Sequence, residues 1–153
     1  MPRIEEQIEI AAGSTKVFRV CHDMDRRPEL DERVSRAQVL TPKPIRRGSV
    51  IRFDTQPAVG NVFSWDAEVV EYSFPSSSKL RVVDVAPSSS FVSGNETWRL
   101  SSSGGSTRVT LTWEYKPRGI IGGILDLLVR RRSTGKAVQE SLRNLQRSVE
   151  ATS

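Results

Sequence analysis

In residues 107–116, TRVTLTWEYK, polar and apolar side chains alternate from Arg108 to Lys116. In an extended strand, side chains two residues apart share a face. One face of this strand therefore carries Val109, Leu111, Trp113 and Tyr115. Residues 63–69, FSWDAEV, alternate in the same way. The two segments predict an antiparallel sheet with one apolar, aromatic face and one charged face.

The same alternation of polar and apolar side chains, with a period of two residues, extends over most of the chain before residue 117. An opening strand is predicted from Ile4 to Ile10, and further strands are predicted at 34–41, 48–55, 61–72, 79–86, 91–101 and 106–116. Short Pro-, Ser- and Gly-rich turns separate the later strands, so consecutive hairpins are expected. Two short helices are predicted after the first strand, one beginning near Ser14 and one around Pro28-Glu29-Leu30.

After Pro117 the apolar period changes to that of a helix. The apolar stripe consists of Ile121, Leu125, Leu128, Gly135, Val138, Leu142, Leu145 and Val149. It predicts one amphipathic helix of up to about 30 residues, roughly 45 Å long at 1.5 Å per residue. The only large apolar surface available to cover the stripe is the inner face of the sheet.

Composition excludes several classes of site. The chain has 153 residues, a length typical of one domain, and we expect a single ligand-binding domain over 1–153. It contains one cysteine and one histidine, Cys21 and His22, which rules out an internal disulfide and the common zinc clusters.

Cys21 and His22 are neighbours on a predicted helix, and we expect their side chains to diverge. No phosphate-binding loop is present, so no metal and no cofactor are expected.

The net charge of +5 is concentrated near the C-terminus, where residues 118–153 hold seven basic and three acidic residues. The opening residues are acidic and alternating, unlike a secretory signal, so a cytoplasmic protein is expected. Nucleic acid is not an expected partner, because the aromatic residues face inward. Residues 119–132 join an apolar run to Arg130-Arg131-Arg132. They either form the first turns of the core helix or make transient contact with a membrane surface.

The chain resembles the START-like (SRPBCC) helix-grip superfamily, of the polyketide cyclase/dehydrase and lipid transport type. The segments that carry the resemblance are 14–18, 48–51, 65–72, 107–115, 122–128 and 141–145. The resemblance implies an α+β fold in which a curved seven-stranded antiparallel sheet surrounds a long C-terminal helix. It also implies a cavity for a lipid, a polyketide or another aromatic compound, and some members cyclise or dehydrate such molecules. The oligomeric state is left open.

The residues expected to line that cavity lie on the apolar faces of the sheet and the helix. They are Phe53, Phe63, Trp65, Glu96, Trp98, Trp113, Tyr115, Leu125 and Leu128. The alternative is that the rings are simply core. Flat aromatic ligands stack on such rings, and Trp and Tyr also carry polar tips that can orient a ligand.

Two carboxylates, Glu6 and Glu96, fall on predicted apolar faces. A buried carboxylate needs a cationic partner, water or a raised pKa. A raised pKa would suit general acid or base chemistry in a cyclase or dehydratase, with Glu96 and Tyr115 as candidate catalytic residues. In the alternative interpretation, an arginine pairs with the carboxylate or the strand turns it to solvent. Both a binding protein and an enzyme remain open at this point.

Overall fold

The computed structural model of the chain describes residues 1–55 and 62–151. It contains one antiparallel seven-stranded sheet with the order β1-β7-β6-β5-β4-β3-β2. The strands are β1 (Arg3–Ile10), β2 (Val34–Val39), β3 (Val50–Thr55), β4 (Ser64–Ser73), β5 (Ser77–Val85), β6 (Phe91–Ser103) and β7 (Ser106–Pro117). Strands β2 to β7 follow one another as hairpins, and β1 closes the sheet against β7.

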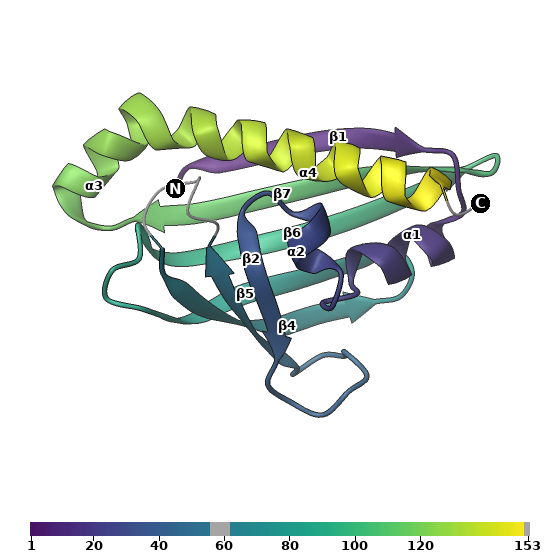
Figure 1. Cartoon of the computed structure of the whole chain (residues 1–153), viewed down its shortest axis with the longest axis horizontal. Helices are drawn as coiled ribbons and strands as arrows, with labels where there is room; N and C mark the ends of the chain where they lie inside the picture. Colours follow the sequence, from purple (N-terminus) through teal and green to yellow (C-terminus); the bar gives the residue numbers. More distant parts are fainter. Residues whose placement is uncertain (56–61, 152–153) are drawn as a thin grey trace.

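The helices are α1 (Ser14–Cys21), α2 (Arg27–Leu30), α3 (Gly119–Leu125), the π-helical turn η2 (Asp126–Arg130) and α4 (Arg131–Ala151). In Figure 1 the sheet curls beneath α4, which runs along β1, while α1 and α2 lie below it. The helix-grip α+β fold is thus confirmed. The strand ends differ from prediction by a few residues, and residue 61 of the predicted strand 61–72 lies outside the described residues.

Bulges give the sheet its curl. The register shifts twice between β4 and β5, between Asp66 and Ala67 and again between Val69 and Glu71. Another shift interrupts the pairing of β6 with β7 between Phe91 and Ser93. Each bulge increases the local twist and bends the strand that carries it. The bent sheet presents a concave apolar face, as the alternation in β7 predicts, since Val109, Leu111, Trp113 and Tyr115 are all buried.

The C-terminal half of the predicted helix stripe is confirmed. Val138, Leu142, Leu145 and Val149 of α4 are buried in the main core with Ile4 and Ile10 of β1. Fully burying such a side chain stabilises the fold by roughly 1.5–3 kcal/mol. This half of the helix therefore fixes α4 to the sheet.

The N-terminal half of the stripe was predicted wrongly. Ile121, Leu125 and Leu128 are 76%, 42% and 72% exposed. The π turn η2 takes more residues per turn than an α-helix, so it rotates the preceding residues relative to α4. Asp126 consequently points inward, and it is 3% exposed. Within residues 1–55 and 62–151, no helix is both long enough and apolar enough to cross a bilayer.

Candidate ligand-binding pocket

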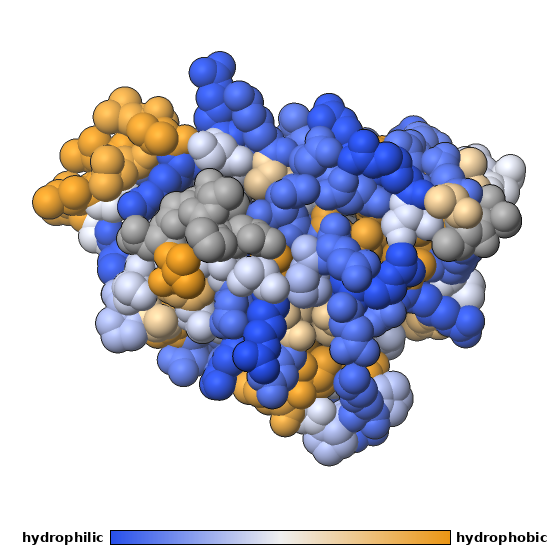
Figure 2. Space-filling view, viewed as in Figure 1, coloured by the Kyte–Doolittle hydropathy of each residue, from blue (hydrophilic) through white to orange (hydrophobic). Residues whose placement is uncertain are grey.

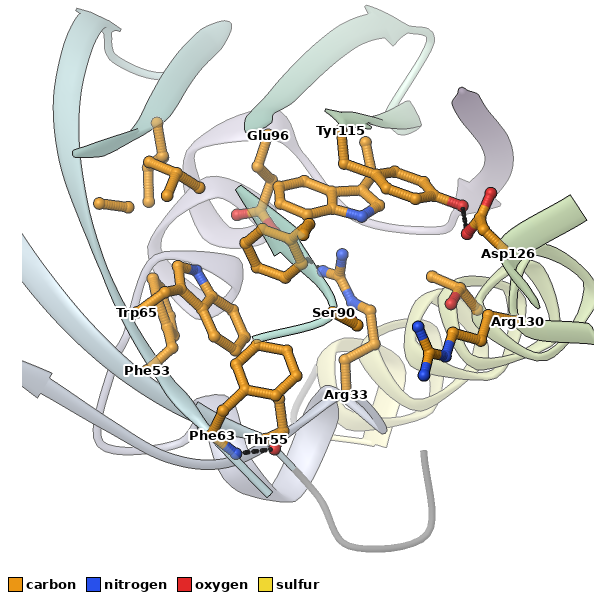
Figure 3. A pocket seen from close by; sticks show the side chains of 16 residues that line it. Arg33, Phe53, Thr55, Phe63, Trp65, Ser90, Glu96, Tyr115, Asp126 and Arg130 are labelled. Carbon is orange, nitrogen blue, oxygen red and sulfur yellow. Dashed lines mark hydrogen bonds and ion pairs between the residues drawn. The ribbon is translucent and has the colours of Figure 1, made fainter. Parts of the chain in front are cut away.

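A pocket lies between the concave face of the sheet and the start of the long helix (Figure 3). Its free volume is about 80 Å³. The aromatic part of its wall consists of Phe53, Phe63, Trp65, Phe91, Trp113 and Tyr115. The helix contributes Asp126, Arg130 and Thr134. These three residues are spaced four apart, so they share one face of the helix. That face points into the pocket in place of the predicted apolar stripe.

The aromatic side chains form a continuous series of ring contacts across four strands. Phe53 stacks on Trp65 with ring centres 5.3 Å apart, and Trp65 contacts the edge of Phe91 at 5.6 Å. Phe91 continues to Trp113 at 5.2 Å, and Trp113 stacks on Tyr115 at 5.8 Å. These distances are typical of favourable aromatic pairs, so the rings hold one another in place.

Glycine at position 94 makes room for one of these rings. A Cβ atom on Gly94 would lie 2.6 Å from Cη2 of Trp113. Any side chain there would push the indole away from β6. The flat position of Trp113 along the pocket wall thus depends on a residue of the neighbouring strand.

The structure brings most of the predicted site residues together. Phe53, Phe63, Trp65, Glu96, Trp113 and Tyr115 all line the pocket. Trp98 is buried but lies outside the lining, where its Nε1 donates a hydrogen bond to Glu96 over 3.0 Å. Leu125 and Leu128 point away from the pocket because of the π turn.

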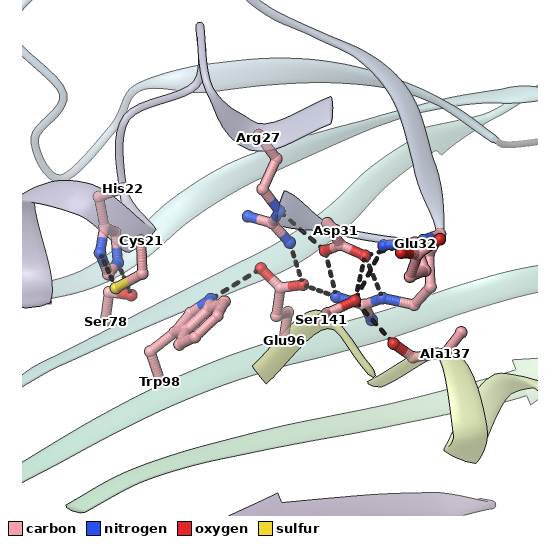
Figure 4. A network of polar contacts seen from close by, with 11 residues as sticks. Cys21, His22, Arg27, Asp31, Glu32, Ser78, Glu96, Trp98, Ala137 and Ser141 are labelled. Atoms are coloured by element: carbon pink, nitrogen blue, oxygen red, sulfur yellow. Dashed lines mark hydrogen bonds and ion pairs between the residues drawn. The ribbon is translucent and has the colours of Figure 1, made fainter. Parts of the chain in front are cut away.

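Glu96 belongs to a buried network of four charged side chains (Figure 4). One oxygen of Glu96 accepts from Arg27 at 2.7 Å and from Arg33 at 2.8 Å. Both arginines also donate to Asp31, at 2.8 Å each. Ser141 of α4 donates to Asp31 as well, over 3.3 Å, and so attaches the network to the long helix.

The network settles the ionisation of Glu96. Burial alone would raise its pKa, but the charges of Arg27 and Arg33 outweigh burial and hold the pKa below its ordinary value. The hypothesis of a raised pKa is therefore wrong for Glu96, and the alternative of pairing with arginine is what the structure shows. A carboxylate bound by two guanidinium groups is a poor general acid.

The guanidinium groups also contact the rings. Arg27 lies over Phe53 at 5.2 Å and over Trp98 at 5.6 Å. Its Nη1 is buried and has no hydrogen-bond partner among residues 1–55 and 62–151. Arg33 lies 6.0 Å from the Trp113 ring and reaches the middle of the pocket in Figure 3. Sequence reasoning missed both arginines.

A second polar group lies where the helix meets the pocket. The hydroxyl of Tyr115 donates to Asp126 over 2.5 Å, and Arg131 donates to the other oxygen of Asp126 over 3.0 Å. Burial raises the pKa of Tyr115, and the hydrogen bond to Asp126 raises it further. Tyr115 therefore stays protonated and acts as a donor. The interruption of the apolar run 120–129 by Asp126 was the sequence signal for this pair.

Glu6 lies at the edge of the sheet. It is half-buried and accepts a hydrogen bond from Gln139 of α4 over 3.0 Å. Glu6 does not line the pocket.

The prediction that Cys21 and His22 diverge was wrong. Their Sγ and Nδ1 atoms are 3.1 Å apart, because the His22 ring folds back to stack on Phe18 at 3.9 Å. Burial raises the pKa of the Cys21 thiol and lowers that of His22 to about 4. Nε2 of His22 also lies 2.6 Å from the hydroxyl of Ser78. The pair is thus neutral and packed into the core, without the thiolate that nucleophilic chemistry requires.

Solved structures similar to this one share its fold along nearly the whole chain. Protein TTHA0849 from Thermus thermophilus has a TM-score of 0.82 at 23% identity, covering 99% of both chains. A START superfamily protein from Mycobacterium smegmatis has a TM-score of 0.77 at 15% identity, also over 99% of both chains. The Zhui aromatase/cyclase from Streptomyces sp. R1128 has a TM-score of 0.71 at 16% identity, covering 96% of this chain and 95% of that one.

No curated protein sequence is significantly similar to this chain. The family profile described as polyketide cyclase / dehydrase and lipid transport does match, over residues 1–150. That span includes every strand of the sheet, the ring-lined pocket and almost all of α4. With sequence and fold in agreement, the chain belongs to the polyketide cyclase/dehydrase and lipid transport family.

Proposed function

We propose that the chain binds a hydrophobic, ring-containing small molecule in this pocket, with an oxygen of the ligand accepting from Arg33. The observation that carries the proposal is the series of aromatic contacts from Phe53 to Tyr115 with a guanidinium at its centre. Aromatic faces favour flat ligands, and a charged donor in an apolar wall favours a ligand with an acceptor. A lipid tail would use the rings but would leave the donor unused.

The size of the pocket limits which ligands enter without rearrangement. A free volume of about 80 Å³ is well below the space that a drug-sized ligand occupies. A single ring fits, whereas a fused polyketide would require the side chains at the helix to move. Arg130 is suited to such movement, because its side chain is half-exposed and forms no hydrogen bond or ion pair within the described parts of the chain.

The names of similar proteins agree with this class of ligand. The Zhui protein is an aromatase/cyclase, and the family includes lipid transport. At 16% identity the likeness to the Zhui protein extends only to the fold. The aromatic character of the ligand is therefore inferred from the rings of this chain.

Filling the pocket tests the proposal. The probe is salicylate, a fluorescent single-ring compound with oxygen acceptors that matches the free volume of the pocket, and fluorescence titration measures its affinity. Ala67 lies in the wall and is 2% exposed, so Ala67→Leu should weaken binding about tenfold or more. Val83→Leu is the matched control, because Val83 is an exposed residue of β5 outside the lining. Equal affinity of both variants and the parent protein, with the fold verified by circular dichroism, would refute the proposal.

A second candidate function is that of a cyclase or dehydratase, and the Tyr115–Asp126 pair favours it. A protonated phenol beside a carboxylate supplies a proton donor and an acceptor at the edge of the ring-lined wall. General acid–base catalysis contributes about 10²–10⁴-fold to a rate. If the chain turns over a polyketide-like ketone, Tyr115→Phe should reduce turnover about 100-fold and leave probe affinity unchanged. Unchanged turnover would remove Tyr115 from the reaction.

A further inference from the structure

The helix that borders the pocket presents an uncovered apolar surface. All large apolar residues of α3 and η2 are exposed, from 42% for Leu125 to 85% for Ile120. This α3–η2 patch consists of Ile120, Ile121, Ile124, Leu125, Leu127, Leu128 and Val129. Figure 2 shows it as an orange projection at the upper left, the place where Figure 1 draws α3 beyond the end of β7. Such clustered exposure is rare on a monomer unless something binds there.

Small or polar residues occupy the inner side of the same segment. Gly122 and Gly123 are half-buried, and Asp126 is buried against Tyr115. No residue of α3 is buried. The segment is therefore held against the body by its polar side, while its apolar side chains point to solvent. This is the reverse of the usual arrangement for a helix on a core.

The charges around the patch are almost entirely positive. Residues 116–136 hold the basic residues Lys116, Arg118, Arg130, Arg131, Arg132 and Lys136 and one acidic residue, Asp126. Asp126 is buried and bound to Arg131. The side chains of Arg130, Arg132 and Lys136 form no hydrogen bond or ion pair within residues 1–55 and 62–151. Apolar side chains beside unpaired cationic side chains are complementary to a partner that has an apolar interior and an anionic surface.

We propose that the α3–η2 patch docks on the surface of a membrane that contains anionic phospholipid. The seven residues of α3 and the five of η2 make a rod of about 18 Å at 1.5 Å per residue, too short to span a bilayer but long enough to lie in its interface. The apolar side chains enter the acyl boundary, and the exposed Arg132 and Lys136, which do not line the pocket, contact lipid phosphates.

A second copy of the chain fits the patch less well. In a two-fold dimer the same surface meets itself, so the unpaired arginines of one copy would approach those of the other. Like charges at such a contact oppose association. An anionic bilayer, in contrast, uses both the apolar and the cationic part of the surface.

Docking would place the pocket next to the lipid. Asp126 and Arg130 line the pocket from the same turn whose outer side carries Leu127, Leu128 and Val129. The proposal does not depend on ligand binding, because the patch and the pocket lie on opposite sides of the helix. A protein that fails to bind the fluorescent probe can still bind vesicles, and the two assays separate the two proposals.

Vesicle flotation with the full chain tests the docking. Phosphatidylcholine vesicles with and without phosphatidylglycerol are used at low and at high salt. We expect binding only to the anionic vesicles, weakened by salt. Leu128→Asp and Ile120→Asp should each lower vesicle affinity about tenfold or more, whereas Val83→Asp, with the same change at an exposed site on β5, should not.

Charge reversal tests the cationic part. Arg132→Glu should lower vesicle affinity about tenfold or more. Arg47→Glu alters the net charge equally, but at an exposed site outside the α3–η2 patch, and should change vesicle affinity little. Absence of binding to anionic vesicles at low salt would overturn the proposal, as would equal losses in patch and control variants. Sedimentation that shows a dimer dissociated by Leu128→Asp would overturn it in favour of a second copy.

Discussion

A guanidinium nitrogen of Arg33 lies 2.8 Å from a carboxylate oxygen of Glu96, and both side chains line the pocket. The same oxygen accepts from Arg27, and Asp31 binds both arginines from the other side. Two positive and two negative groups thus hold one another in the apolar interior. Because each guanidinium is fixed before a ligand arrives, little ordering of these groups remains for the binding step.

The first prediction concerns this network. Glu96→Gln removes one negative charge and leaves two buried arginines facing one carboxylate. Breaking a buried ion pair from one side costs about 3–5 kcal/mol, so the free energy of unfolding should fall by about 3 kcal/mol. Urea denaturation followed by circular dichroism measures the change.

Glu9→Gln is the matched control for that substitution. Glu9 forms an ion pair with Arg108 in which both side chains are 59% exposed. Exposed pairs contribute little to stability, and the control should unfold close to the parent protein. Similar unfolding of both variants would show that the buried network does not stabilise the fold.

The second prediction concerns Gly94 and Trp113. Gly94→Ala forces the indole of Trp113 off the strand and toward the pocket. Overpacking of this kind costs about 1–3 kcal/mol, and the displaced ring should also weaken binding of the fluorescent probe. Gly13→Ala is the control, since a Cβ atom at Gly13 meets nothing within 4 Å. Unchanged melting and unchanged probe affinity in Gly94→Ala would contradict the tight contact.

The pattern of apolar residues was enough to predict the sheet. Residues 107–116 could be assigned to a strand because side chains two apart must share a face, and Trp113 and Tyr115 are indeed buried together. The helix stripe was predicted correctly from Val138 onward and wrongly at Ile121, Leu125 and Leu128. A π turn leaves no mark in the spacing of Leu125 and Leu128, because a helical period cannot show where one extra residue enters a turn.

Site residues could be predicted only where the alternation of side chains within a single strand identified them. Glu96 stood out as a carboxylate on an apolar face, but its partners Arg27 and Arg33 are more than sixty residues away in the chain. No local pattern reports such a contact. The spacing of Arg27 and Asp31, four residues apart, was the available signal for half of the network. Phe91 was not predicted in the ring series because simple alternation in strand 91–101 puts it on the face opposite Glu96, whereas the bulge between Phe91 and Ser93 brings it to the pocket side.

The third prediction concerns pH and the histidine. The pKa of His22 is lowered to about 4 by burial, whereas the unfolded chain takes up a proton near pH 6.5. As pH falls from about 6.5 towards 4, protonation favours the unfolded chain, and stability declines by roughly 3 kcal/mol over the window. His22→Gln should be less stable near pH 7 and should lose much of this slope between pH 6.5 and 5. An identical slope in the variant would assign the pH dependence to other groups.

The fourth prediction concerns the Tyr115–Asp126 pair. The chain has two tyrosines, Tyr72 and Tyr115, and burial is the leading cause that raises the pKa of each above 10. In Tyr115 the nearby Asp126 charge adds to that effect, so its phenol should be the last to ionise. Absorbance titration of the folded protein between pH 9 and 11 should therefore show little phenolate from Tyr115, and the difference from Tyr115→Phe isolates the Tyr115 signal. Asp126→Asn removes the charge that disfavours a phenolate and should shift the onset of Tyr115 ionisation to lower pH. A shift in the opposite direction would mean that Asp126 does not hold the phenolic proton.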